Sequence, residues 1–202
     1  STAVLLAGWG AQAQDFPETK LTASDGEAGD NFGFFVAVSD GEILVGAPGD
    51  NDNGVSSGSA YLFDADGAET KLTPINGENF DDFGSSVALS GGTALVGVRG
   101  DADNGTNSGS AYLFDGDGTE TKLTASDGAA FDQFGTSVAL SGGTALVGAP
   151  GNSSGSAYLF DADGTETMLT ASDGAPGDQF GSSVALSGDI ALVGVPNDNV
   201  NG

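Results

Sequence analysis

Short apolar stretches alternate with glycine- and aspartate-rich turns along the whole chain. Each stretch is four to seven residues long, rich in Val, Leu, Tyr and Phe, and bounded by Gly, Asp or Ser, which is the pattern of a β-strand. No stretch has the length or the 3.6-residue periodicity of a helix. The Asp-Gly pairs at 66–67, 117–118 and 163–164 predict type I′ hairpin turns, in which both central residues have positive φ. The pattern therefore predicts an all-β protein.

The strand-like stretches recur at a nearly fixed interval, and this repeat is the strongest feature of the sequence. Phe-Gly occurs four times, at spacings of 51, 51 and 46 residues, and each copy is followed by two apolar stretches, the second containing Leu-Val-Gly. The first three copies continue through a polar loop into Gly-Ser-Ala-Tyr-Leu-Phe-Asp and a fourth stretch ending in Leu-Thr. Four strands in each repeat of about 40 to 50 residues predict the blade of a β-propeller. The complete repeats cover about residues 28–75, 79–126 and 130–172.

The two ends of the chain each carry half of a repeat. Segment 178–202 contains the first two strands of a fourth copy, and residues 1–27 contain an apolar strand and a Lys-Leu-Thr strand like those that end the other repeats. Residues 2–6 align with the third strand of the first repeat, residues 59–63. We therefore predict a single domain over residues 1–202, a β-propeller of four four-stranded blades with the fourth blade split between the N- and C-terminal segments. Strands from both ends would then cover each other's edges.

Residues 1–13 are open to a second interpretation. They can form a strand that is exchanged with another copy, or they can be the end of a secretory signal that finishes in an Ala-Gln-Ala cleavage motif. Both interpretations indicate export, and no stretch of 18 or more apolar residues predicts a membrane-spanning helix. We therefore expect an extracellular or cell-surface protein. The candidate assembly residues are Ala3, Val4, Leu5, Leu6 and Trp9.

The composition excludes several kinds of chemistry. The chain has 29 acidic residues against 4 basic ones, a formal net charge of −25, and neither His nor Cys. It therefore has no Ser-His-Asp triad, no Cys nucleophile, no zinc site built of imidazoles or thiolates and no disulfide. Its charge would repel nucleic acids and anionic lipids. Because the acidic residues recur at equivalent positions instead of forming one unique cluster, we expect that the protein is not an enzyme.

Two loops are candidates for binding Ca²⁺. After the second strand of the first two repeats, alternating acidic and amide side chains followed by Gly can place oxygen ligands around a hard cation. The same residue types also favour turns, because their side chains hydrogen-bond nearby backbone groups. No carboxylate follows at the position where EF-hand-type loops close, so both interpretations stay open. The candidate calcium ligands are Asp50, Asp52, Asn53, Asp101, Asp103 and Asn104.

Three further sets of residues are singled out by their positions. An Asp two residues before each Phe-Gly is expected to accept backbone N–H groups where one blade leads into the next, the alternative being a shared central cation site. Lysines recur in the fourth strand, where lysine on a sheet edge discourages unwanted pairing. Two Asn-x-Ser/Thr sequences predict glycosylation of surface loops. The blade-junction residues are Asp30, Asp81, Asp132 and Asp178, the strand lysines are Lys20, Lys71 and Lys122, and the glycosylation candidates are Asn104 and Asn152.

The repeat resembles the FG-GAP repeat of integrin α-chain propellers and of many bacterial surface proteins. Phe-Gly opens each copy, and Gly-Ala-Pro follows at 46–48 and 148–150, with altered versions at 97–99 and 194–196. The resemblance covers nearly the whole chain, and it implies an extracellular β-propeller used for adhesion, ligand binding or assembly. Members of this family commonly have more blades than are counted here. The integrin-like calcium loop between the first two strands is missing from this sequence.

Two functions follow from this interpretation. The first is a non-catalytic structural or adhesive subunit that self-assembles head-to-tail, with the N-terminal strands of one copy completing the blade of the next in a surface polymer or filament. The second is a closed monomeric propeller that binds a protein or glycan with the help of Ca²⁺. The long spacer at residues 10–17 favours the first, because it gives the N-terminal strand freedom to reach a neighbour. We therefore expect another copy of the chain to be its main partner.

Overall fold

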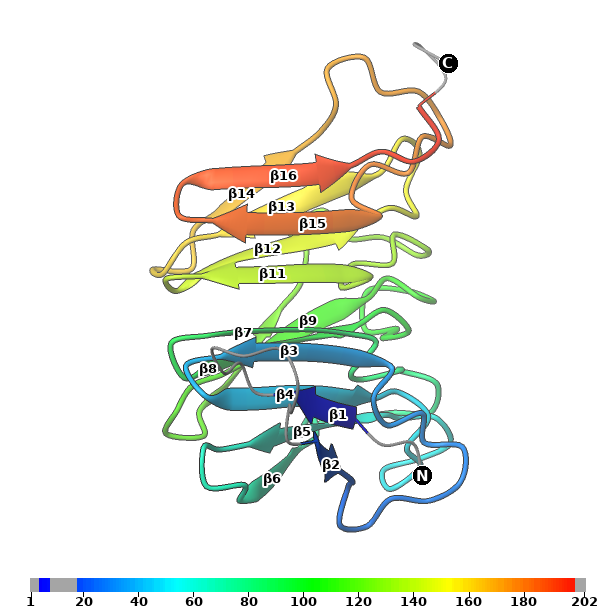
Figure 1. Ribbon diagram of the computed structural model, residues 1–202. Helices are drawn as coiled ribbons and strands as arrows, with labels where there is room; N and C mark the ends of the chain where they lie inside the picture. Colours follow the sequence, from blue (N-terminus) through cyan, green and yellow to red (C-terminus); the bar gives the residue numbers. More distant parts are fainter. Residues whose placement is uncertain (1–3, 8–17, 199–202) are drawn as a thin grey trace.

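The computed structural model describes residues 4–7 and 18–198, and every regular element within these ranges is a β-strand (Figure 1). Each complete repeat forms one four-stranded sheet, and the two half repeats form two-stranded sheets. The first sheet contains β3 (Phe35–Ser39), β4 (Glu42–Ala47), β5 (Ser59–Phe63) and β6 (Glu69–Leu72). The second contains β7 (Ser86–Ser90), β8 (Thr93–Val98), β9 (Ser110–Phe114) and β10 (Glu120–Leu123). The third contains β11 (Ser137–Ser141), β12 (Thr144–Ala149), β13 (Ser156–Phe160) and β14 (Glu166–Leu169). The half repeats pair β1 (Val4–Ala7) with β2 (Glu18–Leu21), and β15 (Ser183–Ser187) with β16 (Ile190–Gly194).

Each four-stranded sheet is an antiparallel meander in which the spatial order of the strands follows the chain. The first strands of successive repeats, β3, β7, β11 and β15, are neighbours, so the sheets stack on one another like the blades of a propeller (Figure 1). This arrangement confirms the prediction of an all-β fold built from four-stranded sheets that recur along the chain.

The hairpin between β5 and β6 shows how the Asp-Gly turns form. The Asp64 N–H donates to the Ala68 carbonyl, and the Gly67 N–H donates to the Asp64 carbonyl. The Asp64 carboxylate also accepts the N–H groups of Asp66 and Ala68. The turn lies where the sequence predicts it, but the predicted type I′ is wrong, because Gly67 has a φ of 82° whereas Asp66 is not left-handed. The Asp64 side chain stabilises a longer loop with a single left-handed glycine instead.

The core consists of apolar layers between successive sheets. Between the first and second sheets, Leu44 and Ala60 face Phe83, Val96 and Tyr112, and all five side chains are buried. The Phe of the Phe-Gly pair is therefore a core residue, and the Phe83 ring lies 5.8 Å from that of Tyr112, centroid to centroid. Each layer joins two repeats, so no blade has a complete core of its own.

The glycine of the Leu-Val-Gly stretch in each complete blade lets the next repeat approach closely. A Cβ atom on Gly97 would lie 2.1 Å from the carbonyl oxygen of Gly135, which belongs to the Phe-Gly pair of the following repeat. A parallel bridge between Gly109 and Phe134 joins the same two blades. The Phe-Gly and Gly-Ala-Pro elements therefore recur together because they meet at each junction between blades.

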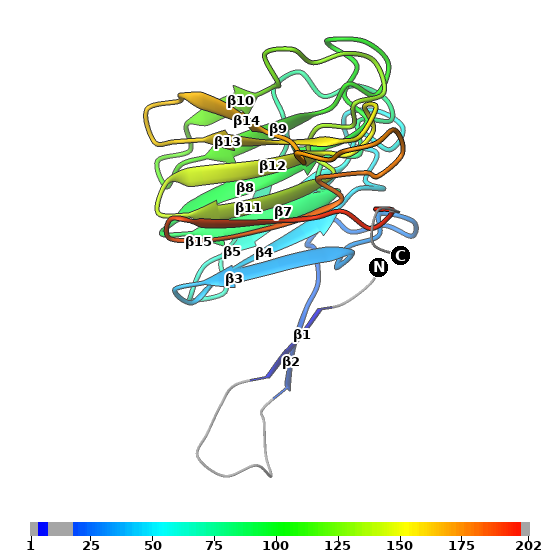
Figure 2. The same cartoon turned by 90° about the horizontal axis from the view of Figure 1, so that it is seen from above.

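The two half repeats lie at opposite ends of the stack (Figure 1). The β1–β2 hairpin extends from the first sheet, and β15–β16 packs on the third (Figure 2). They are separate sheets, so one copy forms no fourth four-stranded blade within its described residues. The number of blades and the split blade therefore remain predictions. In the same part of the chain, the structure contains no helix that is long and apolar enough to cross a membrane.

Candidate functional site

The outer edge of β16 differs from the edges of its counterparts in the complete blades. The second strand of each complete blade pairs with a strand on both sides, whereas β16 pairs with β15 alone within the described residues. Leu192 of β16 is 68% exposed, although Leu44, Leu95 and Leu146 at the same position of the other repeats are fully buried. This end of the stack therefore has an unpaired backbone edge and an uncovered apolar face.

The opposite end of the stack is also uncovered. Val38 of β3 is 72% exposed, whereas Leu89 and Leu140, at the same position of the second and third repeats, are buried beneath the preceding sheet. Val36 on the same strand is exposed as well. The two exposed ends are different surfaces. One is the face of the first blade that points away from the second blade, and the other is the face of the last half blade that points away from the third blade.

The β1–β2 hairpin has the register of the outer half of a blade. Leu5 pairs with Lys20, as Tyr61 pairs with Lys71 in the first blade. This pairing gives Leu5 the place of Tyr61, one residue away from the alignment that the sequence predicts. The shift changes which residues share a face of the sheet. Of the predicted assembly residues, Ala3 and Trp9 lie outside the described part of the chain.

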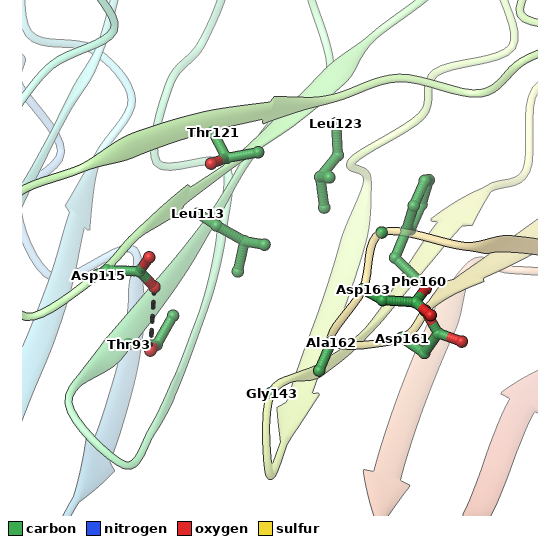
Figure 3. A pocket seen from close by; sticks show the side chains of 11 residues that line it. Thr93, Leu113, Asp115, Thr121, Leu123, Gly143, Phe160, Asp161, Ala162 and Asp163 are labelled. Atoms are coloured by element: carbon green, nitrogen blue, oxygen red, sulfur yellow. Dashed lines mark hydrogen bonds between the residues drawn. The ribbon is translucent and has the colours of Figure 1, made fainter.

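The cleft between two neighbouring blades has a counterpart between the hairpin and the first sheet. The hairpin thus stands where the outer half of a preceding blade would stand. Between the second and third sheets, Leu123 faces Phe160 across a cleft of about 460 Å³ (Figure 3). Between the hairpin and the first sheet, Leu21 and Phe63 line a cleft of about 340 Å³ at the matching positions. Strand β2 of the hairpin therefore lies against the first blade as β10 of the second blade lies against the third.

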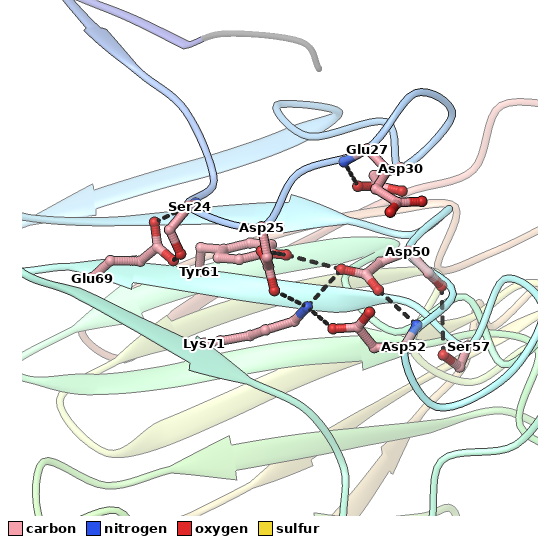
Figure 4. Close-up of polar contacts among 10 residues, drawn as sticks. All are labelled: Ser24, Asp25, Glu27, Asp30, Asp50, Asp52, Ser57, Tyr61, Glu69 and Lys71. Atoms are coloured by element: carbon pink, nitrogen blue, oxygen red, sulfur yellow. Dashed lines mark hydrogen bonds and ion pairs between the residues drawn. The ribbon is translucent and has the colours of Figure 1, made fainter.

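The first candidate calcium loop is organised around a lysine. Lys71 Nζ lies 2.7 Å from Asp25 Oδ2 and 2.9 Å from Asp50 Oδ2, and it also pairs with Asp52 (Figure 4). The Tyr61 hydroxyl is within hydrogen-bond distance of both Asp25 and Asp50. Burial raises the pKa of Asp50, but the Lys71 ammonium and the Asp52 N–H outweigh it and lower this pKa overall. The ammonium thus occupies the position that a cation would need.

The second loop has a similar arrangement, with Asn76 in the place of Asp25 and the Tyr112 hydroxyl bonded to its amide oxygen. Lys122 Nζ lies 2.6 Å from one carboxylate oxygen each of Asp101 and Asp103, and 5.3 Å from the centre of the Tyr112 ring. Ser110 Oγ donates to Asp101 as well. Burial lowers the pKa of Lys122, but hydrogen bonds to the two carboxylates raise it overall, so the lysine stays charged.

The third repeat lacks both the lysine and the acidic loop. Met168 stands at the lysine position, and Asn152 replaces the first Asp of the loop. The Asn152 amide accepts the Gly155 N–H and donates to Ser156 Oγ, so this loop is held by neutral hydrogen bonds. Because the acid and the lysine disappear together, the lysines are better explained as partners of these loops than as protection of an edge.

The donor set does not fit Ca²⁺ while the lysines remain in place. A calcium ion needs six to eight oxygen ligands and would have to displace an ammonium from the carboxylates. Among residues 4–7 and 18–198, the structure shows no group of three or more acidic side chains placed to hold a metal ion. The Asn104 backbone N–H donates to Ser108 Oγ, as expected of a turn. Asp25 and Tyr61 were missed as members of the first cluster, although Asp25 recurs in the repeat.

The four blade-junction aspartates are buried and form equivalent contacts. The Asp81 carboxylate accepts the Glu78 N–H at 2.7 Å, and its backbone carbonyl accepts the Gly100 N–H. Burial raises the pKa of Asp81 to about 6. The backbone segments on each side of the junction are thus fixed to one residue. The matching carboxylate contacts are Asp30 with Glu27, Asp132 with Ala129 and Asp178 with Ala175.

Comparison with known families agrees with the repeat seen in the sheets. The family model of the FG-GAP repeat matches residues 17–63, 67–114, 118–160 and 164–202. These four matches cover most of the chain. No curated protein matches the sequence.

Proposed function

Because the chain belongs to the FG-GAP repeat family, whose repeats are typical of extracellular adhesion-type propeller modules, we propose that it is a non-catalytic structural or adhesive surface protein. Its copies join head-to-tail, with the β1–β2 hairpin of one copy completing the β15–β16 half blade of the next. The observation that carries this proposal is the position of two complementary half blades at opposite ends of one stack.

The junction blade repeats the pairing of the complete blades. In the first blade β4 pairs with β5 through Val45 and Tyr61. The matching residues at the junction are Val193 of one copy and Leu5 of the next, and the two strands run antiparallel. Backbone hydrogen bonds hold a strand added to a sheet edge, and the side chains on alternate faces set its register.

Joining the ends also covers their apolar faces. In the first complete layer, Leu44 belongs to the same buried cluster as Val87 and Leu89. At the junction, Leu192 takes the place of Leu44 and packs toward Val38 of the next copy. This contact joins two different surfaces, so it repeats from copy to copy and builds an open polymer unless the rotation closes a ring.

An ion pair supports the same register. Lys20 has no ion pair within the described residues, although its counterparts in β6 and β10 each bind two or more carboxylates. In a completed blade, Lys20 of one copy lies beside Asp173 and Asp198 of its neighbour, which stand at the positions of Asp25 and Asp50. The junction then pairs its lysine with counterparts of two of the aspartates that bind Lys71, although Leu5 stands in the place of Tyr61.

Cysteine cross-linking tests the proposal directly, because the chain has no cysteine of its own. Two single variants, Leu5→Cys and Val193→Cys, are purified, mixed and oxidised. Paired residues on antiparallel strands have Cα atoms about 4.5–5.5 Å apart, within the range of a disulfide. We expect a disulfide-linked dimer containing one copy of each variant. The matched control replaces Val193→Cys by Ile75→Cys, which is exposed and lies away from both ends.

The double variant separates assembly from closure within one copy. If Leu5→Cys and Val193→Cys in the same chain give a cross-linked monomer, and the mixed single variants give no dimer, the chain closes on itself and the proposal is wrong. Negative-stain microscopy should show polymers for the unmodified protein and mainly single copies for Leu192→Asp, whereas Ile75→Asp should assemble normally.

A further inference from the structure

A groove crosses one end of the first two blades and reaches Gln133 of the third, and its walls share no residue with the clusters around Lys71 and Lys122. It consists of two cavities of about 340 and 150 Å³ that both have Ser56, Asp82 and Arg99 in their walls. Phe80 lines the larger cavity and Phe34 the smaller. Phe80 is 64% exposed and Phe34 is similarly uncovered, so both rings are accessible to a ligand.

Residues that depart from the repeat gather in this groove. Asp82 stands where the other three repeats have Asn or Gln, and Arg99 stands where they have Pro. At the positions of Phe34 and Phe35, the other repeats have Ser-Ser or Thr-Ser. Since the other repeats build the same strands without these side chains, the fold does not require them. Together they form an asymmetric cluster of polar and aromatic groups, as a binding site needs.

The backbone of the groove is held in a costly conformation. Phe80 has a φ of 68°, and the matching residues of the first and fourth repeats are Gly29 and Gly177. A non-glycine residue in the left-handed region is strained, and the exposed ring gains little from burial in return. Ser56 and Asn107 in the same walls also have positive φ. Phe131, at the same position of the third repeat, has the same conformation, so this strain belongs to the repeat and the groove differs from the other junctions by its side chains.

The polar groups of the groove are both donors and acceptors and have no net charge. Arg99 Nε and Nη2 donate to Asp82 Oδ2 at 3.2 and 3.1 Å, and the arginine side chain is 57% exposed. Arg99 Nη1 and Asp82 Oδ1 have no hydrogen-bond partner within the described chain. The amides of Asn107 and Gln133 lie in the same wall and add donors and acceptors.

We propose that this groove binds a neutral carbohydrate chain. Sugar hydroxyls both donate and accept hydrogen bonds, as the walls require, and the apolar faces of sugar rings pack on exposed aromatic rings. A polyanion would be repelled by the net charge of −25. A cationic chain would find no free counter-charge, because Asp82 is the one acidic residue of the described chain that lines the two cavities and it is already paired with Arg99. The proposal does not depend on head-to-tail assembly.

Binding of neutral hexasaccharides to the full chain tests this site. Cellohexaose, xylohexaose, mannohexaose and maltohexaose are titrated by isothermal titration calorimetry, and we expect at least one to bind. Phe80→Gly should weaken that binding at least about tenfold, because it removes the ring. It should not harm folding, because Gly is present at this position in two other repeats. Phe131→Gly is the matched control, since Phe131 has a φ of 71° at the same position of the third repeat and lines neither cavity.

A second pair of substitutions tests the polar groups. Asp82→Asn with Arg99→Pro restores the residues of the other repeats and should weaken binding to a similar extent, with little change in Tm. Polygalacturonate and oligolysine are titrated in parallel as an anionic and a cationic chain. Tighter binding of either polymer, no heat with any of the four neutral sugars, or equal effects of Phe80→Gly and Phe131→Gly would each overturn the proposal.

Discussion

Replacing Lys71 by Met should destabilise the protein, because the substitution leaves a buried carboxylate without its counter-charge. The Asp50 side chain is 4% exposed, and Lys71 supplies the ammonium that it contacts. Removing one partner of a buried ion pair costs about 3–5 kcal/mol. The Lys71 side chain is 21% exposed, so water screens part of this interaction. We therefore expect Lys71→Met to lower the free energy of unfolding by about 2–4 kcal/mol at pH 7.

The third repeat supplies the matched control for this substitution. Its residues at the two positions are Asn152 and Met168, and its loop is satisfied by neutral hydrogen bonds. The double variant Lys71→Met with Asp50→Asn should therefore recover most of the loss, because neither member of the buried pair then carries a charge. A remaining loss of about 1 kcal/mol is expected from the broken contact between Lys71 and Asp25.

Urea unfolding followed by circular dichroism measures these free energies. The pKa of Asp50 is lowered in the folded state, so its ion pair stabilises the protein above the unfolded pKa of about 3.8. That stabilisation is lost as the pH falls through the lower folded value, so the difference between the parent and Lys71→Met should shrink in acid. Ca²⁺ should stabilise Lys71→Met more than the parent, because the ammonium no longer competes for the carboxylates. A loss below about 1 kcal/mol at pH 7, or no recovery in the double variant, would refute this account.

Three further substitutions test other parts of the structure. Burial raises the pKa of Asp81 to about 6, so the folded protein takes up a proton on this residue between about pH 6 and 4, where the unfolded chain does not. The free energy of unfolding should therefore rise by up to about 3 kcal/mol as the pH falls through this window. Asp81→Asn should abolish that rise in urea titrations. Lys20→Met should shorten the polymers seen by light scattering and make their length less sensitive to salt. Gly97→Ala would place a Cβ 2.1 Å from the Gly135 carbonyl oxygen and should lower the free energy of unfolding, measured by calorimetry, by about 1–3 kcal/mol. Gly116→Ala should leave it unchanged, because the other complete repeats have Ala at this position.

The strands could be predicted from the sequence because their signals are local. An apolar stretch bounded by Gly or Asp contains the information that forms a strand and a turn, and the recurrence of Phe-Gly shows which strands share a sheet. The turn type could not be predicted in the same way, because Asp64 stabilises a longer loop through its side chain. The type I′ turn and the longer loop are both compatible with the same Asp-Gly pattern, so the sequence alone does not distinguish them.

The role of the acidic loops depended on contacts that are distant in sequence. Asp50 and Lys71 are 21 residues apart, and Asp25 comes from the linker that precedes the blade. Only the folded sheet brings the fourth strand next to the loop after the second, so the sequence left metal binding and simple turns as alternatives. Comparison of the repeats contains the missing signal, because Met168 and Asn152 replace the lysine and the acid together.

The assembly and the groove have a joint consequence for adhesion. The residues that form the groove occur once in each chain, since Arg99 and Asp82 belong to the second repeat alone and Phe34 to the first. A head-to-tail polymer would therefore present one groove for each copy at a regular interval along its length. An open, mostly polar groove binds a single sugar chain weakly, but several grooves on one polymer bind a polysaccharide with an effective concentration that raises the overall affinity by about 10²–10⁴. Leu192→Asp, which is expected to stop assembly, should then leave hexasaccharide binding unchanged and abolish the tighter binding of the long polysaccharide.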